Sequence, residues 1–304
     1  MDPRVRAGLG SEGVIMTGHN ESRRDFLLVA AVGTAGLALP RSLAGRVARV
    51  QPSLPAGIKL GVASYSLREL SRADAIAAIR ALRTPYVCIK SFHLPYESSP
   101  QQLAGGRKEF EDAGLTIVGG GVITLQQDSD DDIRSYFEYA RLAGMPLMVI
   151  APTPTTLPRI ERFVREYDIA VAIHNHGPED RYFPGPRDAL PIIRDMDPRV
   201  GLCVDLGHTT RTGVDVVEAL AEAGDRLLDI HAKDLRDLMV VDSQCVVGEG
   251  AMPIPAIFRQ LGEMGYEGCV NLEYEIDEQN PLPGMQRSFA YMRGVIHGLG
   301  MAEG

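Results

Sequence analysis

The stretch Val200-Gly-Leu-Cys-Val-Asp-Leu-Gly-His208 decides which fold the sequence predicts. Its first five residues are apolar or small, which is typical of a strand buried on both faces of a parallel sheet. The run ends on the carboxylate of Asp205, and His208 follows three residues later. Taken alone, this ending fits a helix-capping Asp with a surface His as well as it fits a metal or proton-transfer site. Similar polar endings follow other predicted strands, and this recurrence favours a functional site.

Strand-like and helical patterns alternate along the rest of the chain. This alternation predicts βαβ units and a parallel sheet. Eight such units in the about 260 residues that follow residue 44 predict an α/β fold, namely a closed, eight-stranded parallel (β/α)8 TIM barrel with a single domain. The predicted strands span residues 58–64, 86–91, 115–120, 146–151, 169–175, 200–205, 227–232 and 268–273. The predicted helices span residues 72–82, 100–113, 130–143, 157–166, 189–196, 214–223, 254–264 and 285–299.

An open, doubly wound sheet is the structural alternative. Such a sheet often has a Gly-rich dinucleotide-binding turn after an early strand. Gly119-Gly-Gly121 has neither the spacing of that turn nor the helix that should follow it. We therefore interpret these glycines as the small-residue end of the third strand, which would keep a pocket open.

The first 44 residues differ in pattern from the rest of the chain. Ser22-Arg-Arg-Asp-Phe-Leu-Leu28 has the residue order of a twin-arginine signal, and an apolar run rich in Ala and Gly follows it. That run is too short to span a bilayer stably, and Ser42-Leu-Ala44 offers the small residues that a signal peptidase reads. The pattern predicts a twin-arginine signal peptide, and a buried N-terminal helix is the alternative.

These features divide the chain into three predicted segments. Residues 1–44 hold the signal peptide and upstream residues, residues 45–56 a linker, and residues 57–304 the barrel. Met1 and Met16 are both candidate starts. We therefore expect export to the periplasm, with no stable membrane insertion after the signal is cleaved.

The net charge argues against a nucleic-acid-binding protein, and the cysteine spacing argues against a disulfide framework. The chain has a net charge of −9, and because residues 1–44 carry five Arg and four acidic residues, the remainder carries −10. An acidic protein repels phosphate backbones, so we expect no nucleic-acid partner, while a homo-oligomer is left open. The four cysteines show no CxxC spacing and are expected to be free thiols, three on buried strands and Cys245 in a loop.

In a (β/α)8 barrel the active site forms at the C-terminal ends of the strands. Five of the seven histidines fall at these ends among Asp, Glu and Lys residues, whereas His19 and His297 lie elsewhere. Imidazoles combined with carboxylates suit Mn, Zn, Co or Fe and not Ca. Residues two apart on a strand share a face, so each same-strand pair should point into the mouth together. These residues are Arg68, Lys90, His93, His174, His176, Asp205, His208, His231, Lys233, Glu273 and Glu275.

Together these strand ends resemble the xylose isomerase-like superfamily, of the sugar phosphate isomerase/epimerase type, which includes sugar isomerases, epimerases and inosose dehydratases. The resemblance covers about residues 57–298. The motifs are specific for the superfamily in this order, but not for a substrate. They are Ala172-Ile-His-Asn-His-Gly-Pro-Glu-Asp180, Cys203-Val-Asp-Leu-Gly-His208, Asp229-Ile-His-Ala-Lys-Asp234 and Gly265-Tyr-Glu-Gly-Cys-Val-Asn-Leu-Glu-Tyr-Glu275.

The resemblance implies a site for one divalent metal ion, with Mn expected first and Zn, Co or Fe as alternatives. The implied ligands are His174, Asp205, His231 and Glu273. Epimerases of the superfamily usually have Glu at the position of His174, where it is one of two carboxylates that move protons. A position of His174 behind the ligands is the alternative to direct ligation.

The implied function is that of a metal-dependent sugar isomerase or epimerase that removes a proton next to the carbonyl of a sugar or keto-sugar and forms an enediolate. An eliminase of the inosose dehydratase type or a 3-keto-glycoside lyase is one alternative, and a non-catalytic periplasmic sugar-binding protein is another. The expected catalytic residues are Glu273, His176 and Lys233. The expected substrate-binding residues are Lys90, His93, His208 and Arg68.

The twin-arginine pattern predicts the behaviour of a double variant. Replacing Arg23 and Arg24 by Lys should leave the precursor in the cytoplasm, because the receptor of this pathway reads the arginine pair itself. The measurement is the share of protein recovered from the periplasm, with an Arg46→Lys, Arg49→Lys variant as the matched control. Normal periplasmic recovery of the Arg23, Arg24 variant would contradict the export prediction.

Overall fold

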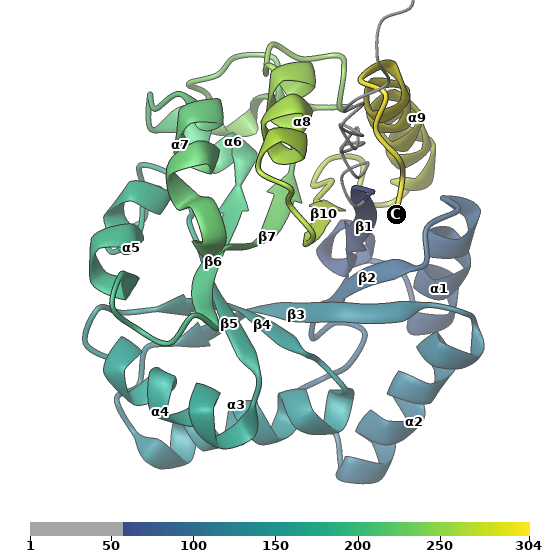
Figure 1. Cartoon of the computed structure of the whole chain (residues 1–304). Coiled ribbons are helices and arrows are strands. Elements are labelled where there is room, and N and C mark those ends of the chain that lie inside the picture. Colours follow the sequence, from purple (N-terminus) through teal and green to yellow (C-terminus); the bar gives the residue numbers. More distant parts are fainter. Residues whose placement is uncertain (1–56) are drawn as a thin grey trace, which may run out of the picture. The chain divides into compact units, whose positions relative to one another are not determined.

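The computed structural model describes residues 57–304, which form a closed barrel of parallel strands surrounded by helices (Figure 1). Around the barrel the strands follow the order β1-β10-β7-β6-β5-β4-β3-β2. Each barrel strand therefore pairs with the next one along the chain, and β10 closes the ring against β1. The predicted eight-stranded (β/α)8 barrel is confirmed. The signal peptide and the linker lie outside the described residues and stay predictions.

The elements have the following bounds. The barrel strands are β1 (Lys59–Ala63), β2 (Tyr86–Ile89), β3 (Thr116–Leu125), β4 (Leu147–Pro152), β5 (Ala170–His174), β6 (Val200–Asp205), β7 (Leu227–Ala232) and β10 (Cys269–Leu272). The α-helices are α1 (Arg72–Ala81), α2 (Pro100–Asp112), α3 (Asp130–Ala143), α4 (Leu157–Tyr167), α5 (Pro186–Ile193), α6 (Leu206–Arg211), α7 (Val216–Ala223), α8 (Ile254–Glu263) and α9 (Leu282–Gly298). The connections contain the 3-10 turns η1 (Ser64–Leu67), η2 (Gly224–Arg226) and η3 (Val241–Ser243), and the antiparallel pair β8 (Asp234–Leu235) and β9 (Gln244–Cys245).

Side chains at the helix starts explain where individual helices begin. Ser99 accepts a hydrogen bond from the backbone N–H of Gln102, and the Gln102 side chain accepts one from the backbone N–H of Ser99, so α2 begins with a capping box. α5 begins at Pro186, three residues before the predicted start at residue 189. Proline suits the first helical position, and the Asp188 side chain accepts a hydrogen bond from the backbone N–H of Gly185.

The glycines at residues 119–121 lie inside a strand and not at its end. β3 continues to Leu125, and a Cβ atom on Gly121 would lie 2.1 Å from the carbonyl oxygen of Val149 on β4. The φ angle of Gly121 is +143°, which residues with a Cβ atom rarely adopt. The expectation that these glycines keep a pocket open is therefore wrong. They let β3 and β4 approach closely where the register of the pair shifts.

Two apolar layers hold the barrel together. The larger one lies between the strands and the helices, and a smaller one contains Cys88, Val149, Ala172 and Cys203. Because side chains alternate along a strand, the residues of this smaller layer point into the barrel. All four cysteines are free and buried, as the sequence predicts, but Cys245 lies on the two-residue strand β9 and not in a loop. The inward face of the strands therefore continues from the small layer towards the C-terminal strand ends.

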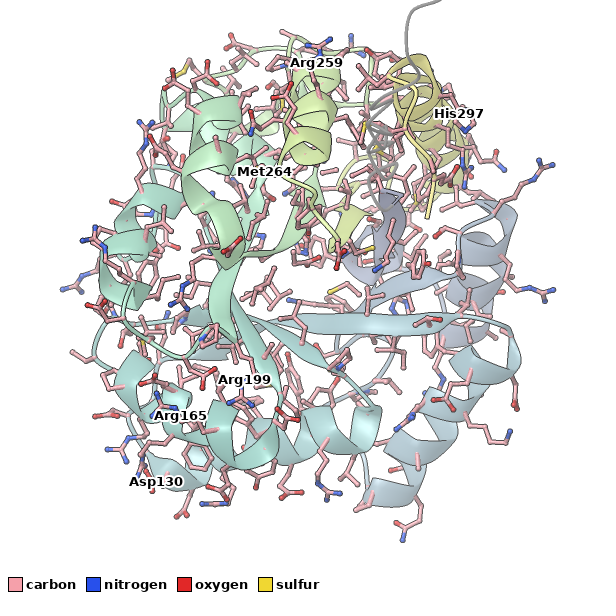
Figure 2. All side chains as sticks on the ribbon, viewed as in Figure 1. Asp130, Arg165, Arg199, Arg259, Met264 and His297 are labelled. Carbon is pink, nitrogen blue, oxygen red and sulfur yellow. The ribbon has the colours of Figure 1, made fainter. Side chains whose placement is uncertain are left out.

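The outer faces of the helices carry exposed charged side chains, several of them in ion pairs. Arg165 on α4 and Arg199 just before β6 both form ion pairs with Asp197. Figure 2 labels the two arginines. His297 is exposed on α9, the last helix, as expected (Figure 2). Among residues 57–304, no helix combines the length and the apolar character that a membrane span requires.

Candidate active site

The end of β6 is built around Asp205, whose two carboxylate oxygens have different partners. Oδ1 accepts a hydrogen bond of 2.8 Å from the backbone N–H of His208 and caps α6. Oδ2 faces Lys233, whose Nζ is 3.1 Å away. The Asn175 side chain holds this backbone in place, because its Oδ1 accepts a hydrogen bond of 3.0 Å from the N–H of Asp205. Asp205 is therefore both the helix cap and a site residue, so the two interpretations of this stretch are compatible.

Four side chains of the metal-ligating type converge at the barrel mouth. His174 ends β5, Asp205 ends β6, His231 lies on β7, and Glu273 directly follows β10. One nitrogen or oxygen atom of each lies within 4.8 Å of the corresponding atoms of the other three. The register of the barrel brings them together, since Asp205 is paired directly with His231 on the neighbouring strand.

The separations within this cluster match those of ligands around one ion. His174 Nε2 lies 3.0 Å from His231 Nδ1 and 3.6 Å from Asp205 Oδ2. His231 Nδ1 lies 3.2 Å from Glu273 Oε2. Four atoms that bind a tetrahedral ion at about 2.1 Å are roughly 3.4 Å from one another. The cluster therefore has the dimensions of a divalent metal site.

The protonation states of His174 and Asp205 also suit a metal ion. Burial lowers the pKa of His174 to about 3, so its imidazole is neutral near pH 7 and can offer a lone pair. Burial would raise the pKa of Asp205, but the positive charge of Lys233 lowers it below its ordinary value. Among the described residues, Asp205 Oδ2 is buried without a hydrogen bond of normal geometry. Its close partner is the ammonium of Lys233, so Oδ2 still has a lone pair that a bound cation could take. For His231, burial would lower the pKa, but the negative charge of Glu273 raises it above the ordinary value, so a metal ion would have to displace a proton from this imidazole.

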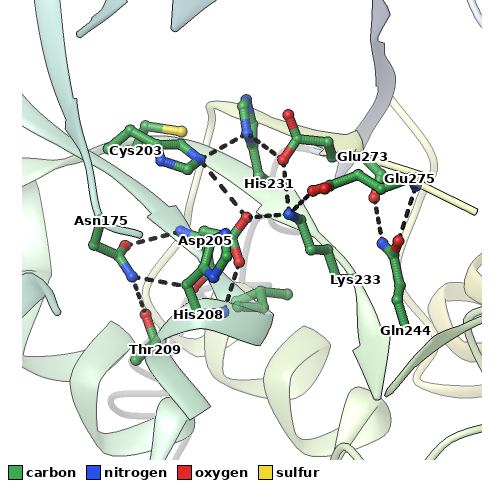
Figure 3. Close-up of polar contacts among 12 residues, drawn as sticks. Asn175, Cys203, Asp205, His208, Thr209, His231, Lys233, Gln244, Glu273 and Glu275 are labelled. Carbon is green, nitrogen blue, oxygen red and sulfur yellow. Dashed lines mark hydrogen bonds and ion pairs between the residues drawn. The ribbon is translucent and has the colours of Figure 1, made fainter. Parts of the chain in front are cut away.

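Lys233 lies among three carboxylates at the edge of the cluster (Figure 3). Its Nζ is 3.1 Å from Asp205 Oδ2 and 3.0 Å from Glu273 Oε2, and it forms a further ion pair with Glu275. Burial would lower the pKa of Lys233, but these three negative charges raise it well above the ordinary value. Lys233 is therefore a fixed cation, suited to stabilise negative charge and a poor acceptor of protons.

His176 is the accessible imidazole beside the cluster. Its ring centroid lies 4.5 Å from that of His174, which confirms that these two residues share a face, and its side chain is 39% exposed. His176 Nδ1 lies 3.1 Å from Asp180 Oδ2. Burial would raise the pKa of Asp180, but hydrogen bonds from the backbone N–H groups of Tyr182 and Phe183 lower it. The ionised carboxylate holds the proton on Nδ1 and leaves Nε2 available for proton transfer.

Lys90 and Arg68, two of the residues expected to bind substrate, make internal contacts. Lys90 Nζ donates a hydrogen bond of 2.9 Å to the carbonyl oxygen of Val122. Arg68 Nη2 donates to the carbonyl oxygen of Glu275 at 3.1 Å and to the carboxylate of Glu278 at 2.6 Å. Arg68 thus ties the end of β1 to the segment after β10, which supports the position of Glu275.

His93 does not join the cluster. It is 1% exposed, and its two ring nitrogens lie 2.9 Å from Ser64 Oγ and 3.2 Å from the carbonyl oxygen of Leu67. Both nitrogens are therefore committed to contacts inside the fold. We leave His93 out of the proposed substrate site for this reason.

A cavity of about 220 Å³ lies beside the cluster. His208, the fourth residue expected to bind substrate, lines it together with Lys233 and Glu275. Leu235 and Ile276 contribute apolar surface. A small concave site with a few polar groups next to an apolar wall is typical of small-molecule binding.

Arg211 is a contributor to this cavity that was not predicted. It ends α6, and its Nη1 lies 3.1 Å from His208 Nδ1. The signal was present in the sequence, because an Asp205 cap places residues 208 and 211 one turn apart on the same helix face. α6 has only six residues inside a predicted loop, so its periodicity is too short to indicate a helix.

Comparisons with known proteins agree with this geometry. A family model described as a xylose isomerase-like TIM barrel matches residues 90–295. The chain is similar to the uncharacterised protein MJ1311 of Methanocaldococcus jannaschii, with 29% identity over 124 residues that cover 39% of this chain and 41% of that protein. It is also similar to an inosose dehydratase of Lacticaseibacillus casei, with 24% identity over 228 residues that cover 67% of this chain and 72% of that protein.

Solved structures support the same fold. The crystal structure of the IolI protein with a bound zinc atom is similar to this chain with a TM-score of 0.68 and 17% identity, over 80% of this chain and 99% of that one. At this level of identity the likeness concerns the fold. The zinc atom is a property of that protein.

The cluster predicts how metal binding responds to mutation. The protein should hold about one divalent ion per chain, because four protein ligands define one site. Asp205→Ala, His231→Ala and Glu273→Ala should each lose the ion, since each removes one of the four ligands, while circular dichroism shows a folded barrel. The measurement is metal content after dialysis.

Asp242→Ala is the matched control for these variants. Asp242 is an exposed acid that lines the cavity but does not belong to the cluster, so this variant should keep the ion. Full metal occupancy in all three cluster variants would show that the site lies elsewhere.

Proposed function

Because the chain belongs to the xylose isomerase-like TIM barrel family, we propose that it is a metal-dependent enzyme that removes a proton next to the carbonyl of a sugar or keto-sugar. The inosose dehydratase of Lacticaseibacillus casei, similar over two thirds of this chain, supports an enzyme of carbohydrate chemistry. The observation that carries the proposal is the buried cluster of two imidazoles and two carboxylates, with His176 and Lys233 beside it.

The residues of the site divide the proposed reaction among them. His174, Asp205, His231 and Glu273 would hold the divalent ion, which supplies polarisation of the substrate oxygens when bound. We propose Mn as this ion, with Zn, Co or Fe as alternatives, because imidazole and carboxylate ligands suit all four.

Proton transfer is assigned to a carboxylate and an imidazole. Glu273 Oε2 belongs to the cluster, so Oε1 is the oxygen that accepts the proton from carbon. The electron pair of the broken C–H bond forms the enediolate, and the ammonium of Lys233 stabilises the negative charge. His176, oriented by Asp180, then gives a proton either to the neighbouring carbon, which completes an isomerisation, or to the opposite face of the same carbon, which completes an epimerisation.

Elimination is the second candidate outcome. The carbanion that Glu273 generates can expel a substituent from the adjacent carbon, with His176 giving its proton to the leaving oxygen. His174 stands where epimerases of the family usually have a second carboxylate, and the similar inosose dehydratase is an eliminase by name. Both observations favour elimination over epimerisation through two carboxylates.

We further propose that the enzyme acts in the periplasm, which rests on the twin-arginine pattern at residues 22–28.

Two substitutions test the assigned proton transfers. Glu273→Gln should abolish exchange of the substrate's α-proton with solvent, because the amide cannot accept the proton. His176→Ala should lower turnover by about 100-fold or more, the usual size of a general acid/base contribution, while metal content stays unchanged. The measurement is deuterium wash-in followed by NMR with Mn-loaded protein on free sugars, inositol ketones and 3-keto-glycosides.

His297→Ala is the control for the His176 variant, because His297 is exposed on α9 and contacts none of these groups. Metal content is measured for every variant, so that loss of the ion from Glu273→Gln is separated from loss of the base. Wild-type exchange rates in Glu273→Gln would overturn the proton-abstraction proposal. Saturable binding of a sugar without exchange or product would instead support a binding protein.

A further inference from the structure

We propose that Arg211 binds an anionic group of the substrate, so that the enzyme prefers a sugar acid or a sugar phosphate to the corresponding neutral sugar. The inference rests on the proposed function, since it takes the cavity beside the metal-ligand cluster as the sugar site. It adds a specificity-determining residue that lies outside the strand ends from which the function was argued.

Arg211 is a cation held inside the protein at the wall of the cavity. It is 4% exposed, and it lines the cavity with His208 and Lys233. The backbone leaves room for its guanidinium at Gly177, which has a φ of +86°. A Cβ atom there would lie 3.0 Å from Arg211 Nη1. The fold therefore places a desolvated guanidinium next to the site, which is costly unless a negative group pairs with it.

The hydrogen bonds of the guanidinium leave one edge incompletely used. Nη1 lies 3.1 Å from His208 Nδ1, and Nη2 forms an ion pair with Glu179. Among the described residues, the buried Nε has no hydrogen-bond partner. Nε and Nη2 form the edge of the guanidinium that binds the two oxygens of a carboxylate or phosphate side by side. Glu179 fills only half of this edge.

Glu179 can be displaced from the edge at little cost. Its side chain is 63% exposed, in the segment between β5 and α5, so water can solvate its carboxylate once it leaves. An ion pair with such an exposed partner is weak compared with a buried pair. An anionic group of the substrate that takes both Nε and Nη2 gains a hydrogen bond that Glu179 does not make.

The other charged side chains at the cavity are not available to bind the anionic group of the substrate. Lys233 is already paired with Asp205, Glu273 and Glu275. Glu275 forms an ion pair with the same ammonium, and Asp242 is exposed at the rim. Arg211 also fixes His208, because a guanidinium can only donate and His208 Nδ1 must accept. The proton of neutral His208 is then on Nε2, where it can donate to a substrate oxygen.

The test compares three hexoses that differ at one carbon. D-galacturonate carries a carboxylate there, D-galactose 6-phosphate a phosphate and D-galactose a hydroxymethyl group. Binding to the full, Mn-loaded chain is measured by isothermal titration calorimetry. We expect wild-type protein to bind at least one anionic sugar about tenfold or more tightly than galactose, since the added bonds are charge-assisted. The preferred anion identifies the substrate as a sugar acid or a sugar phosphate.

Variants assign the preference to Arg211. Arg211→Met should reduce the ratio of the two dissociation constants to about one, and Glu179→Gln should tighten binding of the anionic sugar several-fold without changing that of galactose. Arg236→Met is the control, because Arg236 carries the same charge nearby but is exposed and pairs with Glu249. If Arg211→Met does not fold, Arg211→Lys replaces it, since Lys keeps the charge and lacks the two-donor edge.

The outcomes separate this inference from the proposed function. Equal affinity for galactose and both anionic sugars, or an unchanged preference in the Arg211 variants, overturns the role of Arg211 and leaves the proposed function standing. An unchanged affinity of Glu179→Gln for the anionic sugar also overturns it. Failure of all three hexoses to bind, with the metal present, also overturns the role of Arg211, and the proposed function is then decided by the deuterium-exchange assay.

Discussion

The burial of two ionised carboxylates beside a single ammonium group is the constraint on which the site depends. Asp205 and Glu273 are buried, and a buried carboxylate is stable only when opposite charges or hydrogen bonds replace the water it has lost. Lys233 supplies one such charge to both, at 3.1 Å and 3.0 Å. The neutral imidazole of His174 and the imidazole of His231 complete an environment in which a divalent ion has its ligands already gathered.

The barrel makes this arrangement possible because it fixes the height and direction of each strand end. The inward face of β6 runs from Cys203 in the small apolar layer to Asp205 in the site, and that of β5 runs from Ala172 to His174. Asn175 then links the two strand ends. A shift of one residue in either strand would turn its ligand towards the helices, so the site and the register of the sheet are determined together.

The sequence was most informative where residue types repeat with a simple period. Buried apolar runs, their alternation with helices and the two-residue spacing of His174 and His176 depend only on local geometry, and the structure has them as predicted. The sequence was least informative where the same local pattern is compatible with two different structural roles. Gly121 looks like the end of a strand but permits close contact between two strands. His93 has the position of a site residue, but Ser64 and Leu67 occupy its ring nitrogens.

By itself the sequence determined the parallel barrel, the end of it that carries the polar residues, and the set of residues able to bind a metal ion. These follow from periodicity and from the rule that parallel strands place their C-terminal ends together. The family resemblance already implied which four of those residues meet, but only the tertiary structure decided how each is charged and which groups contact it. The raised pKa of Lys233 and the half-used guanidinium of Arg211 both depend on groups distant in the chain. Burial and charge pairing are properties of such groups brought together, and spacing along one segment does not contain them.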